Sequence, residues 1–209
     1  MNVLEIGFPL SVLSEDITNY KLPEPELVTY YTLEKQRKIW IAGEVDISLL
    51  DYEQLILRWN IEDAGKPVGE RDPIWIYLMN YGGEGDMMWS FIDVMEASVT
   101  PVYTVNMGVC ASAAGIIFLS GHKRFMMSRA HVLIHEGSAA LSGDSTKVLD
   151  AADSYKSSIK AMKEQILKRT NIPAKLLNKK RNNDWELDSA FCLENGVCDV
   201  VVKTIDEII

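Results

Sequence analysis

A single hydroxyl stands among small residues in the segment 108–115 of this 209-residue chain. Ser112 lies between two alanines, so no bulky neighbour in the sequence shields its side chain. Apolar runs at 102–107 and 116–119 flank the segment and predict a strand that turns into a helix. The partial positive charge of a helix N-terminus suits a nucleophile at such a turn. The same small residues also suit close packing of a helix on a sheet, so this segment alone leaves both interpretations open.

A nucleophilic serine needs a base within hydrogen-bond reach and a carboxylate that orients the base. The chain has three histidines. His122 falls in a polar turn, which favours a surface position, whereas His135 ends the apolar run 132–134. The end of a strand is where α/β folds place active residues. Among 30 acidic residues, Asp184 lies in a short segment between two predicted helices, and residue type alone does not single it out.

Backbone N–H groups are also needed, aimed at the oxygen that becomes negatively charged during acyl transfer. Gly82 and Gly83 follow a nearly continuous apolar run at 74–79. Glycine lets a substrate carbonyl approach the backbone closely, so this pair suits the task. A strand followed by two glycines is common, and the pair does not identify a site by itself.

The pattern of apolar residues predicts strands and helices in alternation. We predict strands at 28–33, 38–45, 74–79, 102–107, 124–127, 132–135 and 197–202, and helices at 47–61, 85–97, 116–119, 145–170, 173–181 and 189–194. This alternation indicates an α/β fold with crossover connections. Residues 1–26 show no period and contain three prolines, so we predict an N-terminal arm followed by one domain over 27–209.

The helix predicted at 145–170 is the longest, and its apolar positions form a narrow stripe. A helix of this kind projects from the body of a protein or packs between subunits.

Composition limits the classes of function. A hydrophobic fraction of 47% suits one domain with a sizeable core, and a net charge of −9 argues against nucleic acid as a partner. No apolar run approaches the roughly 20 residues that span a bilayer. Three cysteines without metal-ligand spacing indicate buried free thiols in the cytoplasm. We expect neither a metal nor a cofactor.

Four motifs occur in an order that resembles the ClpP family, the proteolytic subunits of Clp proteases. The resemblance runs from about Lys38 to Val202. Gly83 and Ser112 are 29 positions apart (112 − 83), and His135 and Asp184 are 49 apart (184 − 135), as in the family without a gap. The motifs are Gly-Gly, Gly-x-x-Ala-Ser, Ile-His and Asp-x-x-Leu, here Gly82-Gly83, Gly108 to Ser112, Ile134-His135 and Asp184 to Leu187.

The resemblance implies a fold and a set of roles. The fold is the ClpP/crotonase-like ββα spiral with a projecting long handle helix. Ser112 would be the nucleophile, His135 the general base and then acid, and Asp184 the group that orients the imidazole. The amides of Gly83 and Ala113 would form the oxyanion hole.

The resemblance also implies partners. Seven copies would form a ring, and two rings would stack through the handle helices as a tetradecamer around an enclosed chamber. The substrate would be unfolded polypeptide, delivered by an ATP-dependent unfoldase, since this sequence contains no nucleotide-binding loop.

The sequence departs from the family pattern at several points near these motifs. Met79-Asn80-Tyr81 replaces Asn-Ser-Pro before the glycines, Ala113 replaces a methionine, Glu136-Gly137 replaces Gln-Pro, and Trp185 replaces an arginine of ring-to-ring contacts. Three alternatives therefore stay open. The chain could be a catalytically silent ring subunit or scaffold, or a phage head-maturation protease. It could also be a crotonase-type enzyme that binds an acyl-CoA thioester, although no basic patch for CoA phosphates is evident.

Overall fold

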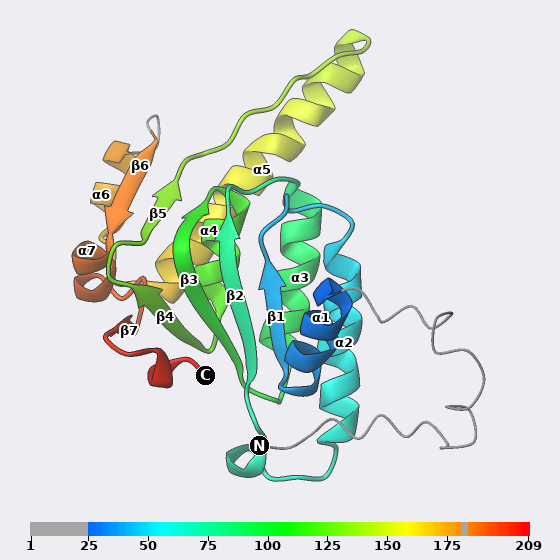
Figure 1. The fold of residues 1–209 in the computed structure, drawn as a ribbon. Helices are drawn as coiled ribbons and strands as arrows, with labels where there is room; N and C mark the ends of the chain where they lie inside the picture. Colours follow the sequence, from blue (N-terminus) through cyan, green and yellow to red (C-terminus); the bar gives the residue numbers. More distant parts are fainter. Residues whose placement is uncertain (1–24, 181–183) are drawn as a thin grey trace, which may run out of the picture. The chain divides into compact units, whose positions relative to one another are not determined.

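The computed structural model describes residues 25–180 and 184–209 (Figure 1). The chain divides into two compact units, Met1–Gln36 and Arg37–Ile209. The arm predicted at 1–26 falls almost wholly outside the described residues and stays a prediction.

The prediction of a strand at 28–33 is wrong, because helix α1 (Pro25–Lys35) occupies these residues. Tyrosine, valine and threonine favour strands, but strand propensity depends on a neighbouring strand to pair with. The residues at the two ends of this segment instead favour a helix. Pro25 stands at the first helical position, where a missing N–H costs no hydrogen bond. Glu26 lies in the first turn and Lys35 in the last, so both charges interact favourably with the helix dipole.

The second unit is built on a seven-stranded sheet with the order β1-β2-β3-β4-β7, all parallel, to which β5 and β6 are added along the far half of β3. β6 is antiparallel to β5. The strands are β1 (Lys38–Ile41), β2 (Ile74–Asn80), β3 (Val102–Ala111), β4 (Lys123–Met127), β5 (His131–Ile134), β6 (Trp185–Asp188) and β7 (Val200–Val202).

Strand β3 changes partner along its length. Its first half pairs with β4, from Tyr103 to Asn106, and its second half pairs with β5, from Val109 to Ala111. The apolar pattern predicts only the first half of β3 and does not predict β6. Both omissions concern the part of the sheet that carries the candidate site.

Helices cover one face of this sheet and one helix leaves it (Figure 1). The helices are α2 (Leu49–Glu62), α3 (Gly85–Ala97), α4 (Ala113–Ser120), α5 (Ser145–Arg169), α6 (Ala174–Lys180) and α7 (Ser189–Glu194), with 3-10 turns at Val68–Glu70 and Ile205–Glu207. All eight residues of α4 are buried, whereas α5 buries only Gln165 and Ile166. The predicted α/β fold with a projecting long helix is confirmed.

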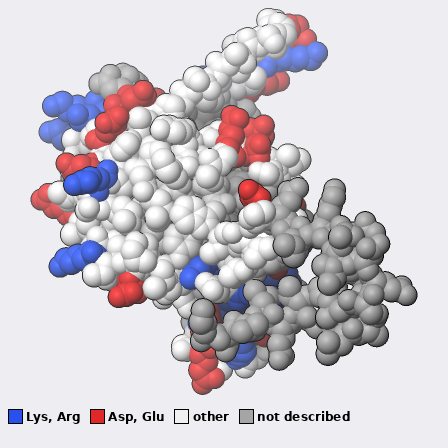
Figure 2. All heavy atoms as spheres, viewed as in Figure 1, with Lys and Arg blue, Asp and Glu red and all other residues white. Residues whose placement is uncertain are grey.

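Alternation along the strands divides the core between the two faces of the sheet. In β2, Ile74, Ile76 and Leu78 belong to the main core under the helices, and Trp75 and Tyr77 belong to a smaller aromatic cluster on the other face. This period of two is what a strand requires. The side of the second unit that faces the viewer in Figure 2 is largely uncharged.

Helix ends follow local signals. The side chain of Asp188 accepts a hydrogen bond from the Phe191 N–H at 2.8 Å and caps α7, as predicted. Asp46 instead accepts from the backbone and hydroxyl of Ser48, so α2 begins at Leu49 rather than at the predicted residue 47. None of the described helices combines the length and apolarity needed to cross a membrane.

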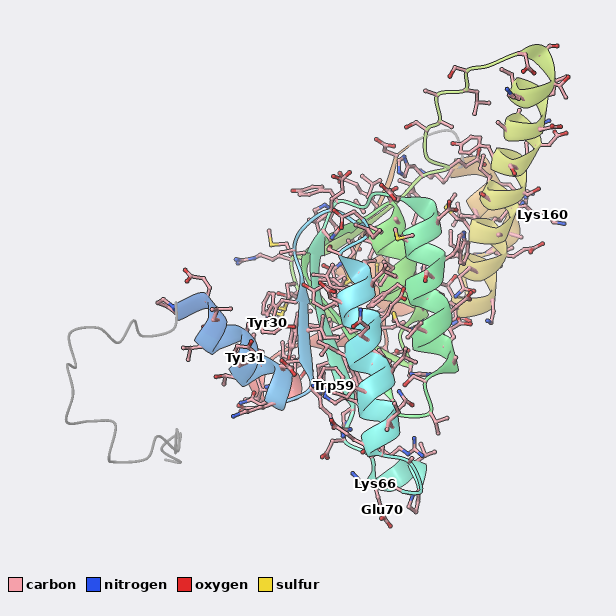
Figure 3. All side chains as sticks on the ribbon, turned by 90° about the vertical axis from the view of Figure 1, so that its right-hand side faces the viewer. Tyr30, Tyr31, Trp59, Lys66, Glu70 and Lys160 are labelled. Carbon is pink, nitrogen blue, oxygen red and sulfur yellow. The ribbon has the colours of Figure 1, made fainter. Side chains whose placement is uncertain are left out.

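A buried ion pair joins α2 to the start of the sheet. The carboxylate of Asp63 is fully buried and accepts hydrogen bonds from Arg37, Lys66 and Thr100. The Arg37 guanidinium, donating at 2.5 and 3.0 Å, is the largest influence and holds the pKa of Asp63 far below its usual range. Lys66 lies in the turn after α2 (Figure 3). A partnered buried carboxylate of this kind fixes the chain where α2 ends.

We predict that Asp63→Asn lowers the free energy of unfolding at pH 7 by about 3 kcal/mol, because Arg37 loses its charged partner in a buried setting. Since the folded-state pKa is depressed, this stabilisation is present above about pH 4 and is lost as the pH falls through the folded value. Urea unfolding measures the first effect at pH 7 and the onset of the second between pH 4 and pH 3. Asp153→Asn removes an exposed pair with Lys156 and serves as the control, with an expected change under about 0.5 kcal/mol.

Candidate active site

The turn between β3 and α4 holds Ser112 in an uncommon conformation. Its φ is +55° and its ψ is −126°, which few residues other than glycine adopt. The Ser112 N–H donates to the Leu133 carbonyl at 2.9 Å and so continues the pairing of β3 with β5. Strain of this kind persists only where the surroundings over-determine it.

The end of β2 approaches this turn closely because residue 82 is glycine. A Cβ on Gly82 would lie 2.7 Å from the Cβ of Ser112 and 2.8 Å from the carbonyl oxygen of Ala111. Asn80 holds the glycine in place, since its side-chain oxygen accepts from the Gly82 N–H at 2.7 Å and its amide donates to the Gly43 carbonyl. Any side chain at position 82 would therefore displace Ser112.

Gly83 forms a parallel bridge with Val45. The bridge uses the N–H groups of Val45 and Glu84, at 2.9 and 2.7 Å, and leaves the N–H of Gly83 outside the pair. Ala113 is the first residue of α4, so its N–H has no acceptor within the helix. Gly83 and Ala113 line the same cleft as Ser112.

His135 and Asp184 are brought together by the antiparallel pairing of β5 with β6. Ile134 pairs with Trp185, so the residues that follow and precede them lie opposite each other. The Nδ1 atom of His135 lies 3.6 Å from a carboxylate oxygen of Asp184. The Nε2 atom is buried and has no hydrogen-bond partner among residues 25–180 and 184–209, and within these ranges no hydrogen bond joins it to Ser112.

The cleft has a volume of about 300 Å³ and lies between the strand ends and helices α3 and α5. The Tyr155 hydroxyl donates to the Glu136 carbonyl at 3.1 Å and ties the chain after β5 to α5. Four of the predicted site residues line the cleft, namely Gly83, Ser112, Ala113 and His135. The other residues that line the cleft are Gly85, Asp86, Met88, Trp89, Glu136, Gly137, Ser138, Ala139, Tyr155, Ser158 and Met162.

Neither His122 nor Cys110 lines this cleft. His122 is on the surface, as predicted, and its Nδ1 accepts from the Val102 N–H at 2.8 Å. Partial burial of the ring lowers the pKa of His122. Cys110 is buried two residues before Ser112, and burial raises the pKa of its thiol, so it does not supply a thiolate.

The predicted buried free thiols are confirmed for Cys110, Cys192 and Cys198. The part of the chain that the structure describes contains no group of three or more His, Cys, Asp or Glu side chains that could hold a metal ion.

In a comparison with models of protein families, the model described as Clp protease matches residues 25–205 of this chain. This chain belongs to the Clp protease family. It is 30% identical over 177 residues to ATP-dependent Clp protease proteolytic subunit 2 of Treponema denticola. The aligned region covers 82% of this chain and 84% of that protein. It is 28% identical over 174 residues to the corresponding subunit of Borreliella burgdorferi, with 81% and 84% covered.

The fold agrees with this membership of the Clp protease family. A ClpP1 mutant from Listeria monocytogenes superposes with a TM-score of 0.73 at 20% identity, over 87% of this chain and 99% of that chain. The expected ClpP-like fold is therefore confirmed.

Sequence reasoning missed the side chains that α3 and α5 contribute to the cleft of this Clp protease family member. Trp89 carries no signal of its own within a predicted helix, and Met162 belongs to the apolar stripe of the long helix. Sequence reasoning also missed strand β6, whose alternation is short, with Leu187 buried and its neighbours exposed or half-buried. Four residues of alternation are too few to identify a strand without knowledge of its partner β5.

We predict that Gly83→Ala lowers the free energy of unfolding by about 2 kcal/mol or more, because φ at this position is +155° and the added Cβ would overlap the backbone of Val45. Urea unfolding measures the change. Gly69→Ala is the control, since no atom lies within 4 Å of the position that its added Cβ would take. An unchanged unfolding midpoint for Gly83→Ala would contradict the described bridge.

Proposed function

We propose that this Clp protease family member is a serine endopeptidase that cleaves unfolded polypeptides by a Ser-His-Asp acyl-enzyme mechanism. The observation that supports it most directly is the shared cleft of Ser112 and His135. Ser112 sits in a strained turn there, and the Nε2 atom of His135 is buried without a partner among the described residues. An imidazole nitrogen without a partner that shares a cleft with a hydroxyl is available to activate that hydroxyl as a nucleophile.

In the first half of the reaction, Nε2 of His135 removes the proton from the Ser112 hydroxyl as Oγ attacks the substrate carbonyl carbon. The carbonyl oxygen becomes negatively charged and accepts hydrogen bonds from the N–H groups of Gly83 and Ala113. The Asp184 carboxylate accepts the Nδ1–H of His135 and stabilises the imidazolium that forms.

In the second half, the tetrahedral intermediate collapses and the C–N bond breaks. His135 donates its proton to the departing amine, which leaves an ester between Ser112 and the acyl part of the substrate. A water molecule then attacks the ester carbonyl carbon while His135 removes a proton from the water. The ester bond to Oγ breaks, and His135 returns the proton to Oγ.

We propose further that the active form is a heptameric ring, with two rings stacked through α5 as a tetradecamer. The support is α5 itself, which projects from the sheet with Leu149 66% exposed on its apolar stripe. Lys160 follows Leu149 by eleven residues, or about three turns, so it lies on nearly the same side of α5, and it points away from the body (Figure 3). An exposed apolar stripe on a long helix is stabilised by packing against another copy.

Assembly also offers a reason for the unmade contacts of the triad. The His135–Asp184 distance of 3.6 Å exceeds a good hydrogen bond, and the Asp184 side chain is 73% exposed. Catalytic hydrogen bonds are often long before substrate or partners are bound. We propose that an ATP-dependent unfoldase supplies the polypeptide and that the protein acts in the cytoplasm, which the three free thiols support.

A second candidate is a catalytically silent ring subunit or scaffold. The observation that favours it is the absence, within the described ranges, of a hydrogen bond between Ser112 and His135. The two candidates differ in whether Ser112 reacts.

We predict that Ser112→Ala lowers the cleavage rate of a fluorogenic peptide by about 10⁴-fold or more, because the nucleophile is lost. Ser128→Ala, an exposed serine outside the cleft, keeps the full rate and serves as the control. Labelling of the unaltered protein by a fluorophosphonate probe, absent in Ser112→Ala, gives a second measurement. An assembled ring that neither labels nor cleaves would favour the silent subunit.

We predict that Leu149→Glu weakens the stacking of rings by about tenfold or more, because a carboxylate replaces an apolar contact. Analytical ultracentrifugation over a range of concentrations measures the dissociation constant. Ser154→Glu adds the same charge at an exposed position of the same helix, five residues or about 140° around the axis from Leu149, and it should leave the assembly unaltered. Equal dissociation constants for Leu149→Glu and the unaltered chain would exclude this part of α5 from the interface.

A further inference from the structure

The walls of the cleft at Ser112 differ in character. Trp89 from α3 and Met162 from α5 give it apolar surface, and both side chains are half-buried. Asp86 lines the cleft from the first turn of α3, three residues before Trp89, so the two side chains lie on neighbouring positions of one helix face. The cleft thus presents an apolar wall with a carboxylate beside it.

The carboxylate of Asp86 is not engaged by the protein. Within residues 25–180 and 184–209 it forms no hydrogen bond and no ion pair, in contrast to Asp63 and Asp199, which both bind arginine. Gly85 precedes it, and no atom lies within 4 Å of the position a Cβ would take there, so the approach to Asp86 is open.

No positive side chain of the described protein compensates this charge in the cleft. Its charged lining residues are Asp86 and Glu136, besides the titratable His135, and the lining includes no lysine or arginine. Lys163 of α5 lines an adjoining apolar pocket, which shares His135, Glu136 and Met162 with this cleft. Figure 2 shows acidic side chains close together near the point where the projecting part of α5 leaves the body of the protein.

We propose that Asp86 is a specificity-determining residue that selects polypeptide segments with a lysine or arginine close to the scissile bond. This inference rests on the proposed peptidase function of the same cleft. Lysine and arginine combine an apolar stem with a terminal cation. The stem packs against Trp89 and Met162, and the cation pairs with the Asp86 carboxylate. Trp89 also offers an aromatic ring for a cation–π contact.

If Asp86 only stabilised helix α3, its replacement would affect peptide cleavage differently than if Asp86 selects the substrate. An acidic residue in the first helical turn stabilises the helix, so its loss would change the cleavage of all peptides equally. Selection changes the ratio of rates between two peptides that differ only in charge. Lysine and norleucine form such a pair, because they share the same stem and differ in the terminal ammonium group.

The experiment compares quenched-fluorescence peptides in which one lysine or one norleucine occupies each of the positions around the scissile bond in turn. For the assembled, unaltered protein we expect kcat/KM to favour lysine by about three- to fivefold at one position or more, as for an ion pair of modest strength. Asp86→Asn should bring that ratio close to one, and Asp86→Lys should reverse it. Salt at about 1 M should also reduce the ratio.

Asp93→Asn is the matched control. Asp93 is an exposed aspartate on the same helix, seven residues or about 10 Å further along, and it does not line the cleft. Its replacement should keep the preference for lysine. A lysine to norleucine ratio near one at every position, or an equal ratio in Asp86→Asn and the unaltered chain, would overturn this inference alone. Absence of any Ser112-dependent cleavage would overturn the proposed function and this inference together.

Discussion

The arrangement of the site depends on the change of partner along β3. If β3 paired with β4 over its whole length, the turn at Ser112 would lie far from β5. Because β3 leaves β4 after Asn106 and pairs with β5 from Val109, Ser112 continues a parallel ladder whose other strand, β5, ends one residue before His135. β5 in turn fixes β6, and β6 fixes Asp184. Backbone hydrogen bonds between these strands thus bring three residues from distant parts of the sequence toward one another.

Close approach of backbone to backbone is the second requirement. Helix α4 is buried along its whole length, so the small residues on either side of Ser112 serve packing as well as access. Gly82 and Gly83 bring the end of β2 against the turn and against Val45, where no larger residue fits. The two interpretations of segment 108–115 are therefore compatible, because the packing that buries α4 also opens the hydroxyl to the cleft.

The sequence predicts much of this fold and part of the site. Long periodic elements such as α3 and α5 are found within one residue of their predicted ends, since their apolar spacing spans many turns. The strand predicted at 28–33 is absent, because strand propensity has no force without a neighbouring strand. Motif order indicates Ser112, His135 and Asp184 as candidates, but their relative placement needs β6, which four residues do not identify. The proposed role of Asp86 could not be predicted from the sequence either, because Asp86 becomes part of a cleft only where α3 and α5 line it together.

Strand β6 has one further consequence. Among the described residues it pairs only with β5, through four residue pairs, and it lies at the edge of the sheet. Edge ribbons open with a lower free energy than the core strands. The proposed orientation of the imidazole by Asp184 therefore depends on a local equilibrium rather than on the stability of the whole chain. A contact that braces this edge would act on the chemistry without touching the substrate, and it would do so by changing how often the ribbon is closed.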